Sequence, residues 1–451
     1  MPRSTTRTSL LLAAALVLPV GARSVGWLIS TESPVDASMA ETGKDLFEHE
    51  WKPDDPLASG GDGLGPVFNA SSCVACHRQG GAGGGGPNEH NVIAFTVRKP
   101  VRPRERTEDA SPPRETVRQG VLHAEAIPAL FLELPQHIDA RLRNLRIVRS
   151  DPATIEAEPQ GAEASMPRCG PGQSERQPAG IDVSQRNTPA LFGAKLIDDI
   201  PARLIIANER RQYVCSSMQK SDQEEFPVGR ASRLPNGRIG RFGWKGQTAS
   251  VADFVQAACA NELGLGNPGS AQPAPLSKPS YSPPGLDLTQ EQCDQMTSFV
   301  QSLPRPIEAV PENAEDQRLA ETGKEMFHAF GCADCHTADI GDVIGIYSDL
   351  LLHRMGRDLQ GGGSYGEPPI PLSDDEPLEG PLADEWRTPP LWGVADSAPY
   401  MHDGRAATLS DAINAHRGQA ARSARAFASA PSTKRQSLVM FLQTMRAPAI
   451  E

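Results

Sequence analysis

The sequence has few aromatic residues and no excess of positive charge. Phe, Trp and Tyr make up 5% of the 451 residues, so we expect something other than aromatic side chains to fill the interior. The net charge is −12, which argues against a nucleic-acid partner, because phosphates would repel such a surface. Gly and Pro number 41 each, and the length and this composition predict a loop-rich chain of two to three domains.

Long hydrophobic runs are also scarce. The apolar run Leu10–Val20 follows Arg3 and Arg7 and precedes small residues, which is typical of a secretory signal peptide at 1–22, cut near Ala22. The run is too short for a comfortable membrane span, and an uncleaved anchor is the alternative. No later run is apolar enough to cross a bilayer, so we expect a mature chain without a transmembrane span, in the periplasm, where disulfides form.

Four of the eight cysteines lie in two Cys-x-x-Cys-His motifs, whose cofactor-binding residues are Cys73, Cys76, His77, Cys332, Cys335 and His336. This spacing is typical of covalent haem c attachment, in which the thiols add to the haem vinyl groups and the adjacent His binds the iron. A redox Cys-x-x-Cys followed by chance by His is the alternative, and zinc would need a different grouping of ligands. We therefore predict two covalently bound haem c groups.

The other four cysteines are even in number, which suggests disulfides in an exported protein. Cys259 and Cys293 lie in segments with a helical apolar pattern, the second with Thr289 as its expected N-cap. We favour a Cys259–Cys293 bond, which leaves Cys169 with Cys215. Buried free thiols are the alternative.

Three phrases occur twice, in the same order. ETGKDLF at 41–47 returns as ETGKEMF at 321–327, RNTPALFG at 186–193 as RTPPLWG at 387–393, and WKGQTASVADFVQAA at 244–258 as HDGRAATLSDAINAH at 402–416. The repeat predicts a mainly α fold of two cytochrome c-type haem domains with long loops, related by internal duplication. The expected domains are 36–303 and 316–451, joined by a linker at 304–315, with loop insertions at 98–118, 152–180 and 267–285.

The third repeated phrase ends on His416 in one copy and on Ala258 in the other. A His can fill the sixth coordination site of a haem iron and an Ala cannot. We therefore expect one haem closed by two protein ligands and suited to electron transfer, and one with an open face suited to chemistry. Thr408 and Asp411 are expected to begin the helix that leads to His416. Glu262, one turn beyond Ala258, would reach over the open iron; a solvated carboxylate at a helix end is the alternative.

The motifs GPVFNASSCVACH, RNTPALFGAKLIDDIP, GRFGWKG, YSDLLLHRMG, EWRTPPLWG and PYMHDGRAATL resemble those of the bacterial di-haem oxidoreductases, a peroxidase-like family of the di-haem cytochrome c peroxidase superfamily. The resemblance spans residues 41–446, in family order. It implies that the C-terminal haem accepts electrons and the N-terminal haem meets hydrogen peroxide. It also implies catalytic roles for Glu262, which helps to break the O–O bond, and for Trp244, which lies between the haems. A calcium ion between the domains is a further feature that the resemblance allows.

The sequence departs from the family pattern at three places. His416 stands where the peroxidases commonly have Met, and two imidazoles generally give a lower potential, which leaves the usual donor and the direction of electron flow open. Lys245 and Gln247 stand where Asp and Arg follow the Trp, and Gln256 is not a clear match for the Gln that precedes the catalytic Glu.

The remaining histidines are weaker ligand candidates. His90 is thirteen residues after His77 and is the metal ligand expected to cap the first haem in a resting state, with His123 as a weaker choice. His353, His402, Met355 and Met401 are alternates near the second haem. We expect His49, His137 and His328 to be ordinary surface or structural residues.

Together these features predict a periplasmic di-haem c-type oxidoreductase, peroxidase-like, in which electrons enter at the C-terminal haem and pass to an open N-terminal haem. The expected partners are a small redox protein or a quinol-linked electron donor, and peroxide or another small oxidant. The alternatives are an electron-transfer cytochrome with two six-coordinate haems, and a haem-containing oxygenase like the rubber-cleaving enzymes.

Overall fold

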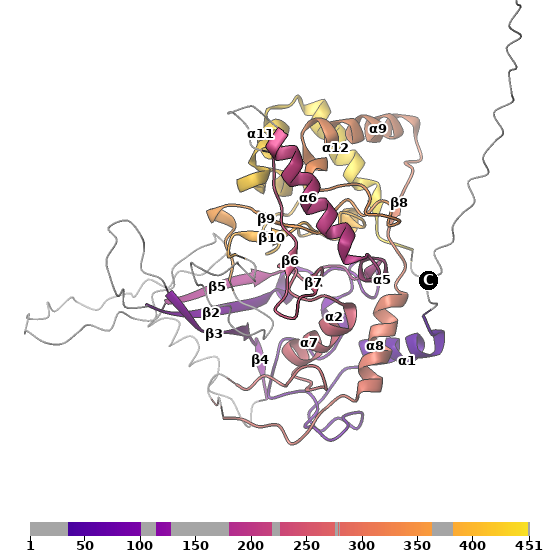
Figure 1. Ribbon diagram of the computed structural model, residues 1–451. Helices are drawn as coiled ribbons and strands as arrows, with labels where there is room; N and C mark the ends of the chain where they lie inside the picture. The colour runs from indigo at the N-terminus through magenta and orange to yellow at the C-terminus, as the bar shows by residue number, and fades with distance from the viewer. Residues whose placement is uncertain are drawn as a thin grey trace, which may run out of the picture. The chain divides into compact units, whose positions relative to one another are not determined.

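Helices make up most of the regular structure in this computed structural model (Figure 1), which describes residues 35–100, 114–127, 180–218, 226–275, 278, 280–362 and 382–449. The helices within these ranges are α1 Ala37–Glu48, α2 Cys73–Cys76, α5 Ala194–Asp198, α6 Ala202–Met218, α7 Val251–Leu263, α8 Gln290–Ser302, α9 Ala314–Ala329, α10 Leu409–Ala415, α11 Ala421–Ser429 and α12 Ser432–Gln443. The predicted mainly α class is confirmed.

Two helix pairs explain why the phrase ETGK occurs twice. α1 packs on α8, and α9 packs on α12. A Cβ added at Gly43 would lie 1.9 Å from the carbonyl oxygen of Gln295, and one at Gly323 would lie 2.0 Å from that of Ser437. Only a residue without a side chain lets the two backbones approach so closely. Each repeated glycine therefore sets the crossing point of its helix pair.

The last residue of the repeated phrase supports the haem motif of its own copy. The ring centroid of Phe47 lies 6.2 Å from that of His77, and the centroid of Phe327 lies 6.4 Å from that of His336. Both Phe side chains are buried. The two copies thus place an apolar wall behind the two predicted iron ligands at nearly the same separation.

The third repeated phrase begins two helices in the same way. The Ser250 side chain accepts a hydrogen bond from the backbone N–H of Asp253 at the start of α7, and Thr408 accepts one from Asp411 at the start of α10. These helices differ in where they end. α7 continues to Leu263, whereas α10 stops at Ala415.

Three longer strands form one sheet, and the other strands are only two or three residues long. The strands are β1 Val67–Phe68, β2 Val92–Pro100, β3 Arg114–Leu122, β4 Glu125–Ala126, β5 Gly180–Arg186, β6 Ser232–Arg233, β7 Ile239–Gly240, β8 Ile307–Glu308, β9 Leu352–Arg354, β10 Glu385–Arg387 and β11 Met445–Arg446. β3, β2 and β5 form an antiparallel sheet in that order, and the others pair as β1–β4, β6–β7, β9–β10 and β8–β11.

The sheet corrects the prediction that 98–118 is a loop. Residues 98–100 end the central strand β2, and residues 114–118 begin β3, with Val97 paired to Arg118. The segment 92–97, VIAFTV, is rich in residues that favour strands. The prediction of a loop missed this strand pattern because the residues that follow are rich in Pro. Of the predicted insertion 152–180, only Gly180 lies within the described residues, and it begins β5. The described part of 267–285 has no helix or named strand, as predicted for a loop.

The predicted linker 304–315 is held by regular structure at two points. β8 pairs with β11 near the C-terminal end, and α9 begins at Ala314. Contacts group Val35–Glu451 into one compact unit. The division into two domains at this linker therefore stays a prediction from the sequence, and the predicted signal peptide 1–22 lies outside the described residues.

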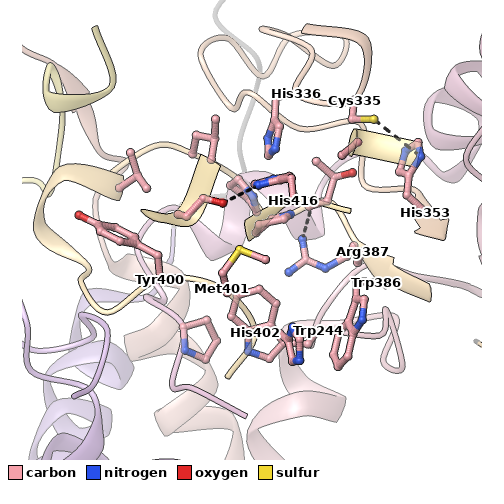
Figure 2. Close-up of a pocket in the computed structure, with 18 of the residues that line it drawn as sticks. Trp244, Cys335, His336, His353, Trp386, Arg387, Tyr400, Met401, His402 and His416 are labelled. Atoms are coloured by element: carbon pink, nitrogen blue, oxygen red, sulfur yellow. Dashed lines mark hydrogen bonds between the residues drawn. The ribbon is translucent and has the colours of Figure 1, made fainter. Parts of the chain in front are cut away.

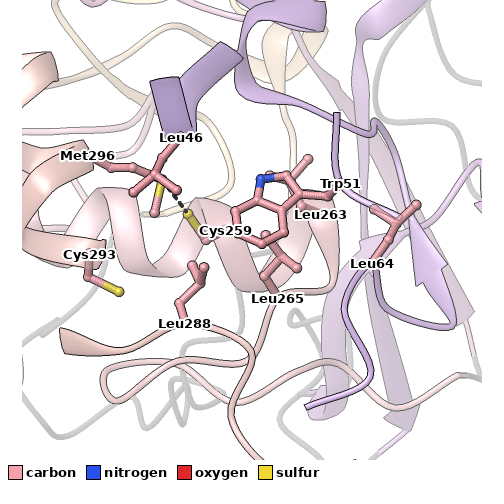
Figure 3. Close-up of a cluster of buried hydrophobic side chains, with 9 residues drawn as sticks. All are labelled: Leu46, Trp51, Leu64, Cys259, Leu263, Leu265, Leu288, Cys293 and Met296. Carbon is pink, nitrogen blue, oxygen red and sulfur yellow. Dashed lines mark hydrogen bonds between the residues drawn. The ribbon is translucent and has the colours of Figure 1, made fainter. Parts of the chain in front are cut away.

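The favoured disulfide between Cys259 and Cys293 is wrong. Both are buried free thiols in one apolar cluster with Leu46, Trp51 and Leu288 (Figure 3). The Cys259 Sγ lies 4.0 Å from the Sδ of Met296 on α8. Helices α7 and α8 place the two cysteines in the same apolar cluster, but the Cys259 thiol points toward Met296 and not toward Cys293. Cys215 is also free, and its predicted partner Cys169 lies outside the described residues.

Candidate functional site

A cavity of about 320 Å³ is lined by the whole second Cys-x-x-Cys-His motif (Figure 2). Cys332, Cys335, His336 and His416 all line it, although 80 residues separate the two histidines in the sequence. Most of the other lining residues are apolar, among them Leu409, Ile413 and Leu438. A mostly apolar cavity with a few convergent polar groups suits a large cofactor.

Three of the predicted iron ligands share one hydrogen-bond pattern. The Nδ1 atoms of His77, His336 and His416 lie 3.1, 2.9 and 2.7 Å from the backbone carbonyl oxygens of Gly84, Tyr347 and Ala412, respectively. Because a carbonyl oxygen only accepts, each Nδ1 carries the proton and each Nε2 keeps its lone pair. Metal-binding histidines typically donate from the other ring nitrogen in this way, which fixes the tautomer and the ring orientation.

The same three imidazoles are neutral at pH 7. Burial lowers the pKa of His77 and of His336 to about 4, and it lowers the pKa of His416 in the same direction. Burial also raises the pKa of Cys76 and of Cys332 to about 12, so both thiols are protonated. His77 and His336 each follow two thiols in the sequence, and His416 faces the thiols of the second motif across the cavity. Neutral imidazoles with a free Nε2 in these positions fit a covalently attached haem.

The two motif copies hold their histidines with equivalent contacts. The N–H of Leu191, in the first NTPALFG phrase, donates to the carbonyl oxygen of Gly83 (2.7 Å), the residue before the one that binds His77. The N–H of Leu391, in the second phrase, donates to the carbonyl oxygen of Ile346 (3.1 Å), the residue before the one that binds His336. The repeated Thr-Pro phrase therefore positions the loop that orients each predicted ligand.

Glu262 lies beside the first haem motif. Its Oε2 accepts a hydrogen bond of 2.6 Å from the Asn69 side chain, and its backbone oxygen accepts one of 2.7 Å from the Asn69 N–H. After burial, its carboxylate is the strongest influence that raises the pKa of the Cys76 thiol. Glu262 is therefore held at the haem motif from the last turn of α7. Its chemical role stays a prediction from the sequence.

His123 lies next to Glu262, a placement that the sequence did not suggest. Its Nε2 donates to the carbonyl oxygen of Asn261 (2.9 Å), and the following N–H, of Ala124, donates to the Asn69 side chain (2.9 Å). Burial lowers the pKa of His123 to about 4. A neutral imidazole and a carboxylate are thus adjacent at the first haem motif.

Trp244 belongs to the first repeat but lines the cavity of the second. The reason is an exchange of backbone hydrogen bonds between aligned positions. The N–H of Asn187, before the first Thr-Pro, donates to the carbonyl oxygen of His402 (2.7 Å), and the N–H of Arg387, before the second, donates to that of Trp244 (2.9 Å). Trp244 and His402 are aligned residues in the two copies, and their ring centroids lie 6.5 Å apart.

Trp244 is also linked to the loop of the first haem motif. Its Nε1 donates to the carbonyl oxygen of Asn187 (2.8 Å), and the Asn187 side chain donates to the carbonyl oxygen of Gly86 (2.9 Å). Gly86 lies two residues beyond the carbonyl that orients His77. Two hydrogen bonds thus connect the indole in the second cavity with the support of the first ligand.

His402 lines the cavity but stacks on an indole. Its ring lies 3.7 Å from that of Trp386 at an angle of 19°, and burial lowers its pKa well below the ordinary value. Lys245 Nζ lies 3.7 Å from the same indole centroid and donates to three backbone carbonyl oxygens at 2.7–3.0 Å. Lys245, which departs from the family pattern, therefore has a structural role, and burial lowers its pKa well below the ordinary value.

His353 is near the cavity with both ring nitrogens engaged. Nε2 lies 2.9 Å from Asp349 and Nδ1 lies 3.0 Å from the Gln419 Oε1, while the Gln419 amide donates to the carbonyl oxygen of Val228. Burial disfavours the imidazolium, yet the Cys335 sulfur and the Asp349 carboxylate raise the pKa of His353 well above its ordinary value. An imidazole that donates from both nitrogens has no lone pair for iron, which argues against His353 as a ligand.

Arg387 is a site residue whose role the sequence did not reveal. It lines the cavity, is buried, and donates from Nε to the carbonyl oxygen of Gly243 (2.9 Å). Burial lowers its pKa to about 10, so it is still a cation at pH 7. A buried guanidinium in an apolar cavity is suited to the carboxylate groups that a haem carries. The sequence shows that Arg387 belongs to the repeated phrase, but it does not show that its side chain points into the cavity.

The remaining His and Met residues show no contact that identifies them as iron ligands among the described residues. Met355 and Met401 line the cavity, and His90 ends a short 3₁₀ helix, Asn88–His90. His49 binds Asp55, and His328 is exposed, as expected of ordinary residues; His137 lies outside the described residues. Among the described residues, the group placed closely enough to hold a metal ion is Cys335, Asp349 and His353, which is not the oxygen-rich set that calcium prefers.

No helix in the described part of the chain is long and apolar enough to cross a membrane. Residues 179–445 match a family model described as "Di-haem oxidoreductase, putative peroxidase". Among curated proteins, the gamma subunit of hydrazine synthase from Kuenenia stuttgartiensis is 32% identical over 110 residues, which is 20% of this chain and 31% of that protein. The chain thus spans about a third of that relative's length.

Two solved structures are similar at 19% identity. One is hydrazine synthase from Kuenenia stuttgartiensis under xenon pressure, with a TM-score of 0.34, over 58% of this chain and 72% of that one. The other is a MauG-like protein associated with microbial copper homeostasis, with a TM-score of 0.26, over 55% of this chain and 90% of that one.

Proposed function

Since the chain belongs to the di-haem oxidoreductase family, we propose that it is a periplasmic peroxidase-type enzyme with two covalently bound haem c groups, built by internal duplication. Electrons enter at the C-terminal haem and pass to an N-terminal haem that has an open face. The single observation that carries this proposal is the difference between His416, which faces His336 across one cavity, and Ala258, at the aligned position of the other copy.

The chain supplies different ligands to the two sites. When bound, haem provides an iron centre that gains and loses electrons and can bind a small oxidant. Cys332, Cys335 and His336 would hold one haem and His416 would close its other side, each histidine through the Nε2 that its Nδ1 hydrogen bond leaves free. Two fixed imidazoles keep that site closed and suit it to electron transfer.

The first site combines an open position with an acid–base group. Cys73, Cys76 and His77 would hold the haem, and α7 presents Ala258 where α10 leads to a ligand. Glu262, one turn further along α7, is anchored by Asn69 beside Cys76. Its carboxylate takes a proton from one oxygen of hydrogen peroxide and delivers it to the departing oxygen, which leaves as water.

Trp244 connects the two sites. It lines the cavity of the second motif, touches its aligned counterpart His402, and reaches the first haem loop through Asn187 and Gly86. A half-buried aromatic ring between two redox centres would shorten the through-space steps that an electron must make.

The proposal predicts one low-spin and one high-spin haem in the isolated protein. Optical and electron paramagnetic resonance spectra measure this directly. His416→Ala should convert the low-spin haem to high spin, because its sixth ligand is lost, and His353→Gln is the matched control that should not. Two low-spin haems in every redox state would replace the proposal with the electron-transfer cytochrome. Turnover with dioxygen and an organic substrate, but not with peroxide, would favour the oxygenase.

A further inference from the structure

A segment near the C-terminal end of this acidic chain carries only positive charge. Residues 412–450 contain six Lys and Arg and no Asp or Glu, although the net charge of the whole chain is −12. The six are Arg417, Arg422, Arg425, Lys434, Arg435 and Arg446. Such a run is often only a solvated surface, so its position relative to the site decides whether it has a role.

The run meets the second haem cavity at α11. Arg422, the first arginine of this helix, lines the cavity and is also exposed to solvent. The cavity therefore reaches the surface at this residue. Arg425 is exposed three residues further along the same helix, and residues three apart are neighbours on a helix surface.

A second helix brings more positive charge to the same place. Gln212 of α6 donates to the backbone oxygen of Asp334 (2.9 Å), inside the second haem motif, and so fixes α6 there. Burial raises the pKa of the Asp334 carboxyl, and the guanidinium groups of Arg422 and Arg211 oppose that shift, so both lie close to it.

An apolar flank adjoins these arginines on α6. Tyr213, Val214 and Met218 have exposed fractions of 68%, 51% and 75%, which are high for residues of their size and type. Large exposed apolar side chains that are grouped and bordered by charge mark interaction surfaces. We call Arg210, Arg211, Arg422 and Arg425, together with this flank, the cationic rim.

We propose that the cationic rim docks an acidic one-electron redox protein, which delivers electrons to the C-terminal haem. Arg422 of the rim lies where the cavity that would hold that haem reaches solvent, and Arg211 lies near Asp334, which lines the same cavity. The charge of the rim is opposite to the net charge of the whole chain. An acidic partner is therefore attracted to this face and repelled from the others. The apolar flank gives the docked pair a surface that excludes water.

The inference rests on the proposed function and names its electron donor. In each encounter the partner's reduced centre would lose one electron, and the C-terminal site, when it holds haem, would take up that electron without any bond formed or broken. Two encounters supply the two electrons that reduce hydrogen peroxide, with two protons, to two water molecules.

The test compares Arg211→Glu/Arg425→Glu with Lys44→Glu in the holoprotein. Neither arginine lines the cavity. Lys44 is exposed on α1, beside the other haem motif, and its substitution changes the charge in the same direction. The probes are two c-type cytochromes, one of net negative and one of net positive charge. Binding is measured by calorimetry on the oxidised pair, and the rate of haem reduction by stopped-flow absorbance.

The acidic cytochrome should bind the double variant about tenfold more weakly at low ionic strength and reduce it correspondingly more slowly. Lys44→Glu should change both quantities less than twofold, and the difference between the variants should vanish near ~0.5 M salt, where surface charges are screened. The inference is overturned by equal effects of the two variants, by stronger binding of the basic cytochrome to the wild type, or by rim-dependent binding of anionic lipid vesicles without binding of the acidic cytochrome.

A separate measurement keeps this inference distinct from the proposed function. Dithionite should reduce both haems, and peroxide turnover with a small-molecule reductant should be unchanged, in wild type and double variant alike. Lack of turnover in the wild type would refute the proposed enzyme. Normal turnover with rim-independent binding would refute only the docking surface.

Discussion

At the scale of single residues, the direction of one hydrogen bond separates the ligands from the other histidines. His77, His336 and His416 each donate from Nδ1 to a backbone carbonyl oxygen and keep a lone pair on Nε2. His353 lies equally close to a haem motif but donates from both nitrogens. Burial lowers the pKa at the first three positions. At the fourth, the Cys335 sulfur and the Asp349 carboxylate raise the pKa of His353 well above its ordinary value.

Glu262→Gln should lower peroxide turnover by about 10²-fold or more, the usual scale for a lost general acid–base. The amide keeps the hydrogen bond with Asn69 but cannot take up and return a proton, so both haem spectra should stay nearly unchanged. The measurement is steady-state peroxide reduction with a small reductant. Glu321→Gln, on the exposed face of α9, is the control, and turnover unaffected by the Glu262 substitution would remove its catalytic role.

Trp244→Phe should slow electron transfer between the haems and leave the fold and both spectra intact. The smaller ring loses the indole hydrogen bond to Asn187 and part of the contact with His402. Flash-initiated reduction of the second haem, followed by optical detection of the first, measures the rate. Trp392→Phe is the matched control, because the aligned residue of the first repeat is Phe192. An unchanged rate in Trp244→Phe would show that this indole only packs.

At the scale of helices, each copy is stabilised by one close crossing. Gly43 and Gly323 allow α1 and α9 to approach the backbones of α8 and α12, and the Phe one turn later on each helix packs behind the adjacent haem ligand. The position of the iron ligand in each copy thus depends on a glycine that is far from any chemistry.

Gly323→Ala should destabilise the protein by about 1–3 kcal/mol, the usual range for overpacking. The new methyl group would lie 2.0 Å from the Ser437 carbonyl oxygen, which is backbone of α12 and cannot rotate away. Chemical denaturation followed by circular dichroism gives the free energy of unfolding. Thr322→Ala, at the exposed neighbouring position, should change it by no more than about 0.5 kcal/mol. Equal effects of the two substitutions would contradict the close crossing.

At the scale of the whole molecule, a buried neutral histidine couples stability to pH. The pKa of His123 is about 4 in the folded chain because of burial, and about 6.5 when unfolded. Between these values the unfolded state binds a proton that the folded state does not, so the unfolding free energy falls as the pH decreases from about 6.5 to about 4. Above about pH 6.5 the titration of His123 does not change the unfolding free energy.

His123→Gln should therefore lose less stability than the wild type between pH 7 and pH 5. Glutamine can still donate to the Asn261 carbonyl oxygen but does not titrate. Urea denaturation at the two pH values measures the difference. The exposed His328→Gln variant should keep the wild-type dependence, and identical pH dependence in all three proteins would mean that His123 is not buried as a neutral base.

Features that depend on residue type at fixed spacing could be predicted from the sequence. These are the two haem motifs, the helical segments around Cys259 and Cys293, the N-caps Thr289 and Thr408, and the aligned pair His416 and Ala258. Each follows from a local rule, because thioether formation, capping and coordination need particular atoms a few residues apart.

The contacts between distant segments could not be predicted from the sequence and are visible in the fold alone. The fold placed Trp244 of the first repeat in the cavity of the second, since aligned positions exchange backbone hydrogen bonds between copies. It turned the Cys259 thiol toward Met296 instead of Cys293, and it set His123 beside Glu262. These contacts join residues far apart in the chain, and the rotation of one helix against another, which no local pattern specifies, fixes which side chains touch.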